Sequence, residues 1–459
     1  MAAVATANPS ARLEAPKVRT TIPGPESARL LDRQGERESN ARTYPRRLTI
    51  APRRGLGSYI EDVDGNVFID FLTGAGVLSL GHSHPEVIEA VARQLPLLTH
   101  GLDFPTEIKD EFITAQLSML PEGMRASTKI GFTGPTGANA VEAALKLCKI
   151  ATGRSEIISF QGGFHGSTTG SMSVTGLVSQ RAGVANTMPG VQFFPYPYSL
   201  RSRFGADEDG RRCLEYFERT LKDPLSGISL PAAVILEVVQ GEGGVIPAPT
   251  DFIQGVRRVT RELDIPLIVD EVQCGCGRSG TWFAFEQHGI VPDVIVASKA
   301  LSGIGLPIAL ILYDERLDVW KPGQHIGTFR GNQVAFAGGV VAIEIIKRDG
   351  ILENVRELGA YALAALEALV EEHAFAAQAR GSGLMLGLEL ADPQTGDHNG
   401  AAAMAVQRAA LERGLILELG GRYDSVIRLL PPLNVTRRTL DQALEILREA
   451  LAEVAGTTV

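Results

Sequence analysis

An acid and a lysine close two short apolar segments in the middle of the chain, and together they could form a reactive pair. Asp270 ends the segment IPLIVD, and Lys299 follows VIVAS 29 residues later. Such segments are typical of buried parallel strands, and open α/β sheets bind ligands at the carboxyl ends of these strands. A lysine amine held there loses its proton readily and becomes a nucleophile for Schiff-base formation. The alternative is a lysine that opens a helix and points into water.

Asp270 has a matching use beside a heterocyclic cofactor. A buried carboxylate keeps a pyridinium nitrogen protonated, which makes the ring of pyridoxal 5'-phosphate an electron sink. Were Lys299 absent, a helix N-cap or a loop acid would be the preferred interpretation of Asp270. The two residues together therefore indicate a pyridoxal-phosphate site more strongly than either does alone.

Two glycine-rich segments could hold the rest of such a cofactor. Residues 132–154 (FTGPTGANAVEAALKLCKIATGR) run from two Thr-Gly pairs into an amphipathic helix, and the free N–H groups of a helix start suit a phosphate. In Gly163–Gly166, an aromatic ring and an imidazole stand between glycines and could cover a flat ring. The alternatives are an ordinary capped helix and simple packing of Phe164 against His165.

Two other patterns point to different chemistry. Residues 275–280 (GCGRSG) match the dinucleotide fingerprint, but no clear helix follows, and Asp293 precedes the next strand where the motif needs an acid closing it. Cys274 and Cys276 form a C-x-C pair without a second pair at zinc spacing. We therefore predict neither a nicotinamide cofactor nor a metal.

The elements around these residues predict an α/β protein. Residues 1–45 lack a sustained apolar period, which predicts a mobile lead with a short helix over 27–37, and residues 57–72 predict a hairpin turning at Asp64-Gly65-Asn66. Helices and apolar strands then alternate, which is typical of a mainly parallel sheet. We expect four parts: the lead (1–45), the N-terminal part of a small domain (46–85), a large cofactor-binding domain (86–345), and the C-terminal part of a small α+β domain (346–459).

Composition excludes several classes of protein. The 459 residues are 44% hydrophobic and 21% charged, unlike a disordered chain, and the net charge of −9 provides no overall positive field for nucleic acid. No apolar stretch approaches the roughly 20 residues that span a bilayer, and the N-terminus lacks the apolar centre of a secretory signal. Four cysteines do not form a disulfide framework in so long a chain. We therefore expect a cytoplasmic protein without a membrane or nucleic-acid partner.

The ordered motifs from about residue 57 to residue 438 resemble the class III (subgroup II) pyridoxal-phosphate aminotransferases. These motifs are GHSHPEV, GPTGANAVEAALK, GGFHG, ILEVVQGEGG, LIVDEVQ, ASK and GTFRGN. The resemblance implies fold type I, in which a large domain with a mainly parallel seven-stranded sheet accompanies a smaller α+β domain. It also implies a homodimer with shared active sites.

The resemblance carries a role to each matching residue. Lys299 would bond covalently to pyridoxal 5'-phosphate, and Asp270 would pair with its ring nitrogen. The other residues expected to contact the cofactor are Gly137, Ala138, Phe164, His165, Glu237, Val272, Gln273 and, from the neighbouring subunit, Thr328. Arg428 would bind the α-carboxylate of glutamate and 2-oxoglutarate, and Glu242 would cover Arg428 when the donor presents a distal amine. Ala138 replaces a common serine, so one phosphate hydroxyl is missing, which Thr136 is a candidate to supply.

Within the class, GPTGANAVEAALK and WKPGQHIGTFRGN most resemble the 2,4-diaminobutyrate:2-oxoglutarate aminotransferases. The expected reaction passes a distal amino group from L-2,4-diaminobutyrate to 2-oxoglutarate, giving L-aspartate 4-semialdehyde and L-glutamate. The alternatives are another omega-amino acid aminotransferase of the ornithine or 4-aminobutyrate type, an aminomutase or epimerase using the same cofactor, and a dimeric binding protein without catalysis.

Overall fold

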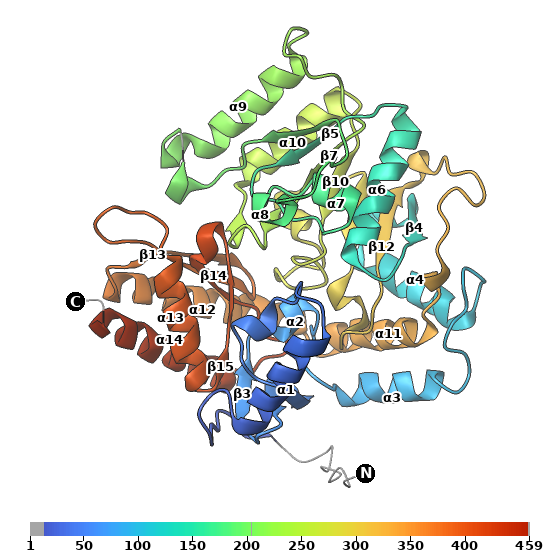
Figure 1. Ribbon diagram of the computed structural model, residues 1–459. Coiled ribbons are helices and arrows are strands. Elements are labelled where there is room, and N and C mark those ends of the chain that lie inside the picture. Colours follow the sequence, from blue (N-terminus) through green and yellow to red (C-terminus); the bar gives the residue numbers. More distant parts are fainter. Residues whose placement is uncertain (1–12, 203, 458–459) are drawn as a thin grey trace.

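A seven-stranded sheet forms the centre of the computed structural model, which describes residues 13–202 and 204–457 (Figure 1). In spatial order its strands are β4 (Thr128–Phe132), β12 (Leu310–Asp314), β11 (Val294–Ala297), β10 (Leu267–Asp270), β7 (Ala233–Leu236), β5 (Ile157–Phe160) and β6 (Val191–Phe194). From β11 to β6 all neighbours run parallel, whereas β12 is antiparallel to both β11 and β4. The predicted α/β class and mainly parallel sheet are confirmed.

Both faces of this sheet are buried because its strands are apolar throughout. On β10, Ile268 packs in a cluster with helix α6 (Gly137–Thr152), while Leu267 and Val269 pack in the cluster on the opposite face. Side chains alternate between the faces of a strand, so helices on both sides are required to cover them. The helices contributing to that opposite cluster are α4 (Glu107–Met119), α9 (Asp209–Lys222), α10 (Thr250–Glu262) and α11 (Gln333–Arg348).

Two four-stranded sheets lie beside this body. One has the order β1 (Pro52–Leu56), β2 (Tyr59–Asp62), β3 (Val67–Asp70), β15 (Leu415–Ile416), and the other β13 (Ala376–Ser382), β14 (Met385–Leu390), β17 (Val426–Leu429), β16 (Glu418–Gly420). Helices α12 (Ile351–Glu372), α13 (Gly400–Glu412) and α14 (Arg437–Thr457) pack with them, at the lower left of Figure 1. Because β15 pairs with β3, chain ends far apart in sequence share one sheet. We propose on this basis that 46–85 and 346–459 form one small domain beside a large domain of 86–345.

The remaining elements are short or peripheral. They are α1 (Pro25–Arg37), α2 (Thr73–Gly76), α3 (Pro85–Gln94), α5 (Glu122–Arg125), α7 (Thr169–Ser173), α8 (Val178–Arg181) and the two-stranded sheet of β8 (Val239–Gln240) with β9 (Ile246–Pro247). In the part of the chain that the structure describes, no helix has the length and apolar character needed to cross a bilayer.

The start of the described chain differs from the predicted lead. Residues 1–12 of that lead lie outside the described residues. Beyond them the backbone of Lys17 pairs in both directions with Val67, and the amide oxygen of Asn66 accepts hydrogen bonds from Arg19 and Thr20. The described part of the lead therefore packs against the hairpin turn through hydrogen bonds to Asn66. The sequence alone does not show that the Asn66 side chain accepts these bonds.

Candidate active site

Lys299 stands just after β11, where the sequence places it, but it does not point into water. Its backbone has φ +44°, in the left-handed region that non-glycine residues seldom adopt, and it opens a 3-10 turn, Lys299–Ser302. Its Nζ donates a hydrogen bond to the carbonyl oxygen of Ala75 at 3.1 Å. Burial lowers the pKa of the Lys299 amine, which favours the neutral nucleophile.

Ala75 belongs to a left-handed turn that holds this carbonyl in place. The four residues of α2, Thr73 to Gly76, all have positive φ. Oδ1 of Asp70 accepts hydrogen bonds from the N–H groups of Leu72 and Thr73, and Oδ2 lies 2.7 Å from Nε2 of His82. These contacts fix the turn, and the Ala75 carbonyl accepts from Lys299 and also from Nε2 of Gln273, at 3.3 Å.

Asp270 lies at the end of β10 and is 4% exposed. Its Oδ2 is 2.8 Å from Nδ1 of His165, and its Oδ1 accepts a hydrogen bond from the N–H of Val272 at 3.0 Å. The side chain of His165 is fully enclosed, so it does not cover a ring as predicted. It contacts the carboxylate of Asp270 instead, and its backbone N–H donates to the hydroxyl of Thr175 at 2.9 Å.

Glu237 ties the GFHG loop to the segment that carries Glu242. Its two carboxylate oxygens accept hydrogen bonds from the N–H groups of Phe164 and Gly241, both at 2.9 Å. Burial raises the pKa of Glu237 to about 7, and the neighbouring charge of Asp270 acts in the same direction. Glu237 therefore positions two loops, while the ring of Phe164 remains half-buried above them.

The N-terminus of α6 faces the same loops. A Cβ on Gly137 would lie 3.0 Å from Val272, and a Cβ on Gly166 would lie 2.7 Å from that of Ala138, so glycine is needed at these close approaches. Thr136 caps the helix, and its hydroxyl bonds to the side chain of Asn139 at 2.8 Å. Thr136 therefore acts as a helix cap, and its use in place of the serine that Ala138 lacks stays a prediction.

Arg428 is fully buried in β17 and lies among acceptors. Its Nη1 is 2.9 Å from Oε1 of Glu242 and 3.3 Å from Oε2 of Glu418, and its Nη2 donates to Oε1 of Gln273 at 2.8 Å. The two glutamates raise the pKa of Arg428 against the effect of burial. Conversely, although burial alone would raise the pKa of Glu242, Arg428 and Lys299 lower it.

Glu418 and Tyr44 were missed by sequence reasoning. Glu418 stands directly opposite Arg428 in the pairing of β16 with β17, and the hydroxyl of Tyr44 donates to its Oε1 at 3.3 Å. The signal for Glu418 was an acid inside the apolar run LILEL, beside the strand of Arg428. Tyr44 comes from a segment 374 residues away and carried no signal.

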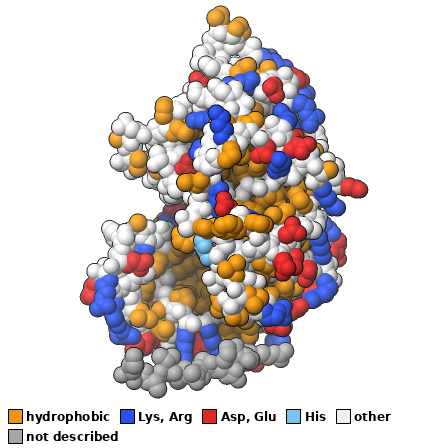
Figure 2. Space-filling view, turned by 90° about the vertical axis from the view of Figure 1, so that its right-hand side faces the viewer, with side chains coloured by type: hydrophobic (Ala, Val, Ile, Leu, Met, Phe, Trp, Pro, Cys, Tyr) orange, Lys and Arg blue, Asp and Glu red, His pale blue; other side chains and the backbone are white. Residues whose placement is uncertain are grey.

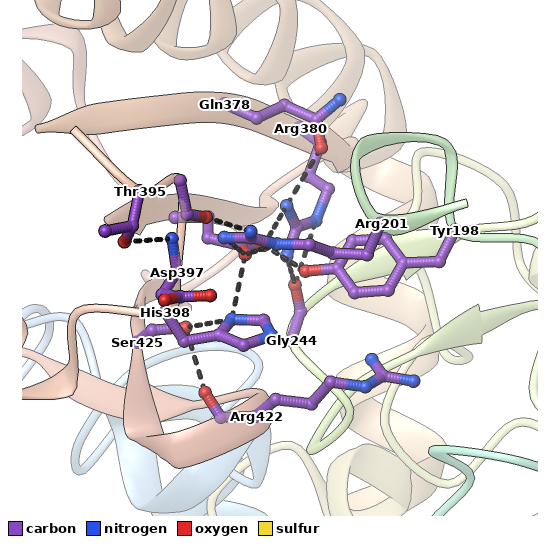
Figure 3. A network of polar contacts seen from close by, with 12 residues as sticks. Tyr198, Arg201, Gly244, Gln378, Arg380, Thr395, Asp397, His398, Arg422 and Ser425 are labelled. Atoms are coloured by element: carbon purple, nitrogen blue, oxygen red, sulfur yellow. Dashed lines mark hydrogen bonds and ion pairs between the residues drawn. The ribbon is translucent and has the colours of Figure 1, made fainter. Parts of the chain in front are cut away.

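The segment after Glu242 is clamped by the second four-stranded sheet (Figure 3). The guanidinium of Arg380 donates to the carbonyls of Gly244 and Val245, at distances from 2.6 to 3.1 Å, and to the buried carboxylate of Glu389 at 2.8 Å. Further contacts to Glu389 come from Tyr198, Arg201 and His398. On the other side, the N–H of Gly421 donates to the carbonyl of Glu242 at 2.9 Å.

Removing this clamp should destabilise the protein. Arg380→Leu is expected to lower the free energy of unfolding by about 3–5 kcal/mol, because Glu389 loses a buried partner and two carbonyls lose their donor. Denaturant unfolding measures the change. The control Arg212→Leu, in an exposed ion pair of α9, should change stability by at most about 0.5 kcal/mol. Equal effects of the two substitutions would show that the clamp does not stabilise the fold.

Thr328 is not brought to these residues within one chain. It lies in an exposed 3-10 turn, Thr328–Arg330, between the exposed side chains of Ile326 and Phe329.

The GCGRSG segment, residues 275–280, leads into a 3-10 helix, Ala284–His288, and not the α-helix that a dinucleotide site needs.

The sequence model of the aminotransferase class-III family matches residues 40–451 of this chain. The chain belongs to this family. Among curated relatives, the diaminobutyrate–2-oxoglutarate aminotransferase of Rhizobium meliloti (strain 1021) is 49% identical over 428 residues, covering 91% of each chain. The enzyme of the same name from Haemophilus influenzae is 44% identical over 434 residues, covering 92% of this chain and 95% of its own.

Solved transaminase structures share the fold of this aminotransferase. An omega-transaminase from Thermomicrobium roseum superposes with a TM-score of 0.85 at 26% identity, covering 95% of this chain and all of its own. An amine transaminase from an uncultivated Pseudomonas species, solved in a PLP-bound form, has a TM-score of 0.83 at 27% identity, covering 91% and 98%. The predicted fold type and class are confirmed.

Proposed function

We propose that this aminotransferase binds pyridoxal 5'-phosphate between α6, the GFHG loop and the ends of β10 and β11. The residues fit that group: the N-terminus of α6 offers N–H groups to a phosphate, buried Asp270 lies beside His165 and the N–H of Val272, and Lys299 is a half-buried amine. When bound, the cofactor supplies an aldehyde that reacts with amines and a ring that withdraws electrons. Gly137 and Ala138 would hold the phosphate, and Phe164, Val272 and Gln273 would contact the ring.

Side chains of the protein would then hold one proton on the cofactor and remove another from the substrate. Asp270, oriented by His165 and by the N–H of Val272, would keep a proton on the ring nitrogen. The neutral amine of Lys299 would act as general base and take a proton from the substrate carbon that bears the reacting nitrogen. The Ala75 carbonyl holds that amine in position when it is free.

The substrates are proposed to be L-2,4-diaminobutyrate and 2-oxoglutarate. The observation that carries this proposal is the pair of buried Arg428 and half-buried Glu242. Arg428 is linked to Lys299 through Gln273, whose amide shares the Ala75 carbonyl with the lysine amine. Arg428 offers a guanidinium for the α-carboxylate of 2-oxoglutarate, and Glu242 neutralises it when a donor reacts through a distal amine that has no carboxylate beside it. The names of the curated relatives support the same pair of substrates. They do not favour an aminomutase, an epimerase or a protein without catalysis.

A homodimer with shared active sites is part of the proposal. Hydrophobic side chains gather around a hollow on the face shown in Figure 2. Two adjoining segments, 97–104 and 326–332, are joined by the backbone of Gly101 and Gly331, and they expose large apolar side chains: Leu97, Leu98, Leu102, Phe104, Ile326 and Phe329. A second copy would cover this surface, and the exposed Thr328 within it would reach the partner's cofactor phosphate.

A cytoplasmic location is also part of the proposal. The four cysteines are buried free thiols, which suits a reducing compartment.

A panel of single donors tests the substrates. Purified holoenzyme with 2-oxoglutarate should form glutamate fastest, measured as kcat/KM, from diaminobutyrate among diaminobutyrate, ornithine, 4-aminobutyrate, lysine and β-alanine. With glutamate alone, the holoenzyme should release 2-oxoglutarate, which an isomerase would not do. A higher kcat/KM for any other donor would reject diaminobutyrate and leave the aminotransferase class standing.

A further inference from the structure

Two carboxylates lie next to Arg428, although one would be enough to balance its positive charge. Glu242 already pairs with Arg428 at 2.9 Å, and Glu418 adds a second negative charge at 3.3 Å. When both glutamates are ionised, the three side chains carry a net charge of −1. The nearby amine of Lys299 would balance this charge if it were protonated, but burial favours its neutral form. Because a buried charge is costly without a partner, the excess points to a cation that comes with the substrate.

Glu418 has a carboxylate oxygen ready for such a partner. The residue is 7% exposed, and its Oε1 accepts from Tyr44. Its Oε2 is buried and accepts no hydrogen bond from the described residues, although it lies within ion-pair distance of Arg428. Burial and the charge of Glu242 raise the pKa of Glu418, as expected for a carboxylate short of donors.

This carboxylate lies in the same set of contacts as Lys299. Nη1 of Arg428 is 3.3 Å from Oε2 of Glu418, and Nη2 of Arg428 donates to Gln273. The side-chain amide of Gln273 in turn donates to the Ala75 carbonyl that accepts from Lys299. A substrate that reacts at Lys299 therefore lies near Glu418. Diaminobutyrate brings two ammonium groups, of which one reacts, whereas 4-aminobutyrate is the same molecule without the ammonium at C2.

We propose that Glu418 is the subsite for the second ammonium group of the donor, which hydrogen-bonds to its Oε2 while the distal amine faces Lys299. The inference rests on the proposed function and makes Glu418, supported by Tyr44, a determinant of donor specificity. It assigns Glu418 a task different from that of Glu242, which covers Arg428. A hydrogen bond between charged groups makes a difference of about 10- to 100-fold in binding.

The test compares the two matched donors in Glu418→Gln holoenzyme. Rapid mixing with donor alone, followed by cofactor absorbance, gives a half-saturating concentration and a limiting rate for each. For diaminobutyrate the half-saturating concentration should rise about 10- to 100-fold, with the limiting rate little changed, whereas both constants for 4-aminobutyrate should stay within about threefold of wild type. Glu412→Gln, an exposed acid of α13, is the control and should change neither.

Two outcomes would overturn the inference. Equal changes for the two donors would mean that Glu418 only positions Arg428, and no change would mean that the ammonium binds elsewhere. If Glu418→Gln does not fold, Glu418→Asp, which keeps the charge, should show a smaller loss confined to diaminobutyrate, and equal effects on both donors would again reject the subsite.

Failure of the proposed function would be visible in wild-type enzyme. If wild type rejects diaminobutyrate but accepts ornithine, the same comparison between ornithine and 5-aminopentanoate, which again differ by one ammonium, tests Glu418 alone. If wild type does not distinguish either diamine from its monoamine, the ammonium subsite is rejected.

Discussion

Lys299→Ala is expected to lower turnover by at least about 10²–10⁴-fold, the usual contribution of a general base, and to abolish covalent attachment of the cofactor. The reason is the position of Lys299: its half-buried amine follows β11, and desolvation favours its neutral form. Kinetics of glutamate formation measure the first effect. Borohydride reduction followed by peptide mapping measures the second.

A matched lysine separates this effect from a general loss of charge. Lys222 lies on α9, is exposed and pairs with Glu218, so Lys222→Ala should keep both turnover and labelling. Labelled peptide in wild type that does not contain Lys299, or turnover of Lys299→Ala within tenfold of wild type, would remove the basis of the proposed mechanism.

Asp270→Asn should lower kcat by about 10²–10³-fold, comparable to the loss of one strong electrostatic stabiliser in an active site. The amide keeps the shape of the carboxylate and an oxygen that accepts from Val272, but it has no negative charge to keep a proton on the ring nitrogen. Borohydride should still label Lys299, which distinguishes this variant from Lys299→Ala. A kcat within threefold of wild type would show that the charge of Asp270 is not required.

His165 provides a graded comparison for Asp270. His165→Gln removes the ring that lies 2.8 Å from Oδ2 but leaves the charge of Asp270 intact. Because His165 acts through Asp270, its loss should be smaller than that of Asp270→Asn. A larger loss would mean that the imidazole contributes to catalysis directly.

Much of the fold follows from local patterns in the sequence. The apolar pattern of the sequence predicts a helix over 85–94 and a strand over 294–297, and both have these bounds in the structure. Pro85 and Pro96 flank the helix, and Pro292 precedes the strand. The same pattern predicts strands over 266–270 and 232–238, which in the structure span Leu267–Asp270 and Ala233–Leu236, shorter by one and three residues. The apolar runs extend past the paired residues, and composition does not mark where pairing begins and ends.

The site was predictable only where function follows from position along a strand. Asp270 and Lys299 sit at strand ends, so the sheet brings them to one edge. The contact of Lys299 with Ala75 spans 224 residues, and that of Tyr44 with Glu418 spans 374. Such pairs depend on how the small sheets dock, which periodicity does not encode. His165 failed as a ring cover for a related reason, since burial depends on the loop above it.

The clamp of Arg380 has a consequence for how one pocket serves two chemically different substrates in turn. The peptide carrying Glu242 is held on both sides, by Glu237 at the N–H of Gly241 before it and by Arg380 at the carbonyls of Gly244 and Val245 after it. In the proposed mechanism, uncovering Arg428 would therefore be a rotation about the Glu242 side-chain bonds, a motion that takes picoseconds to nanoseconds in accessible side chains. In the proposed mechanism the change from acceptor to donor would then leave the backbone of this segment in place.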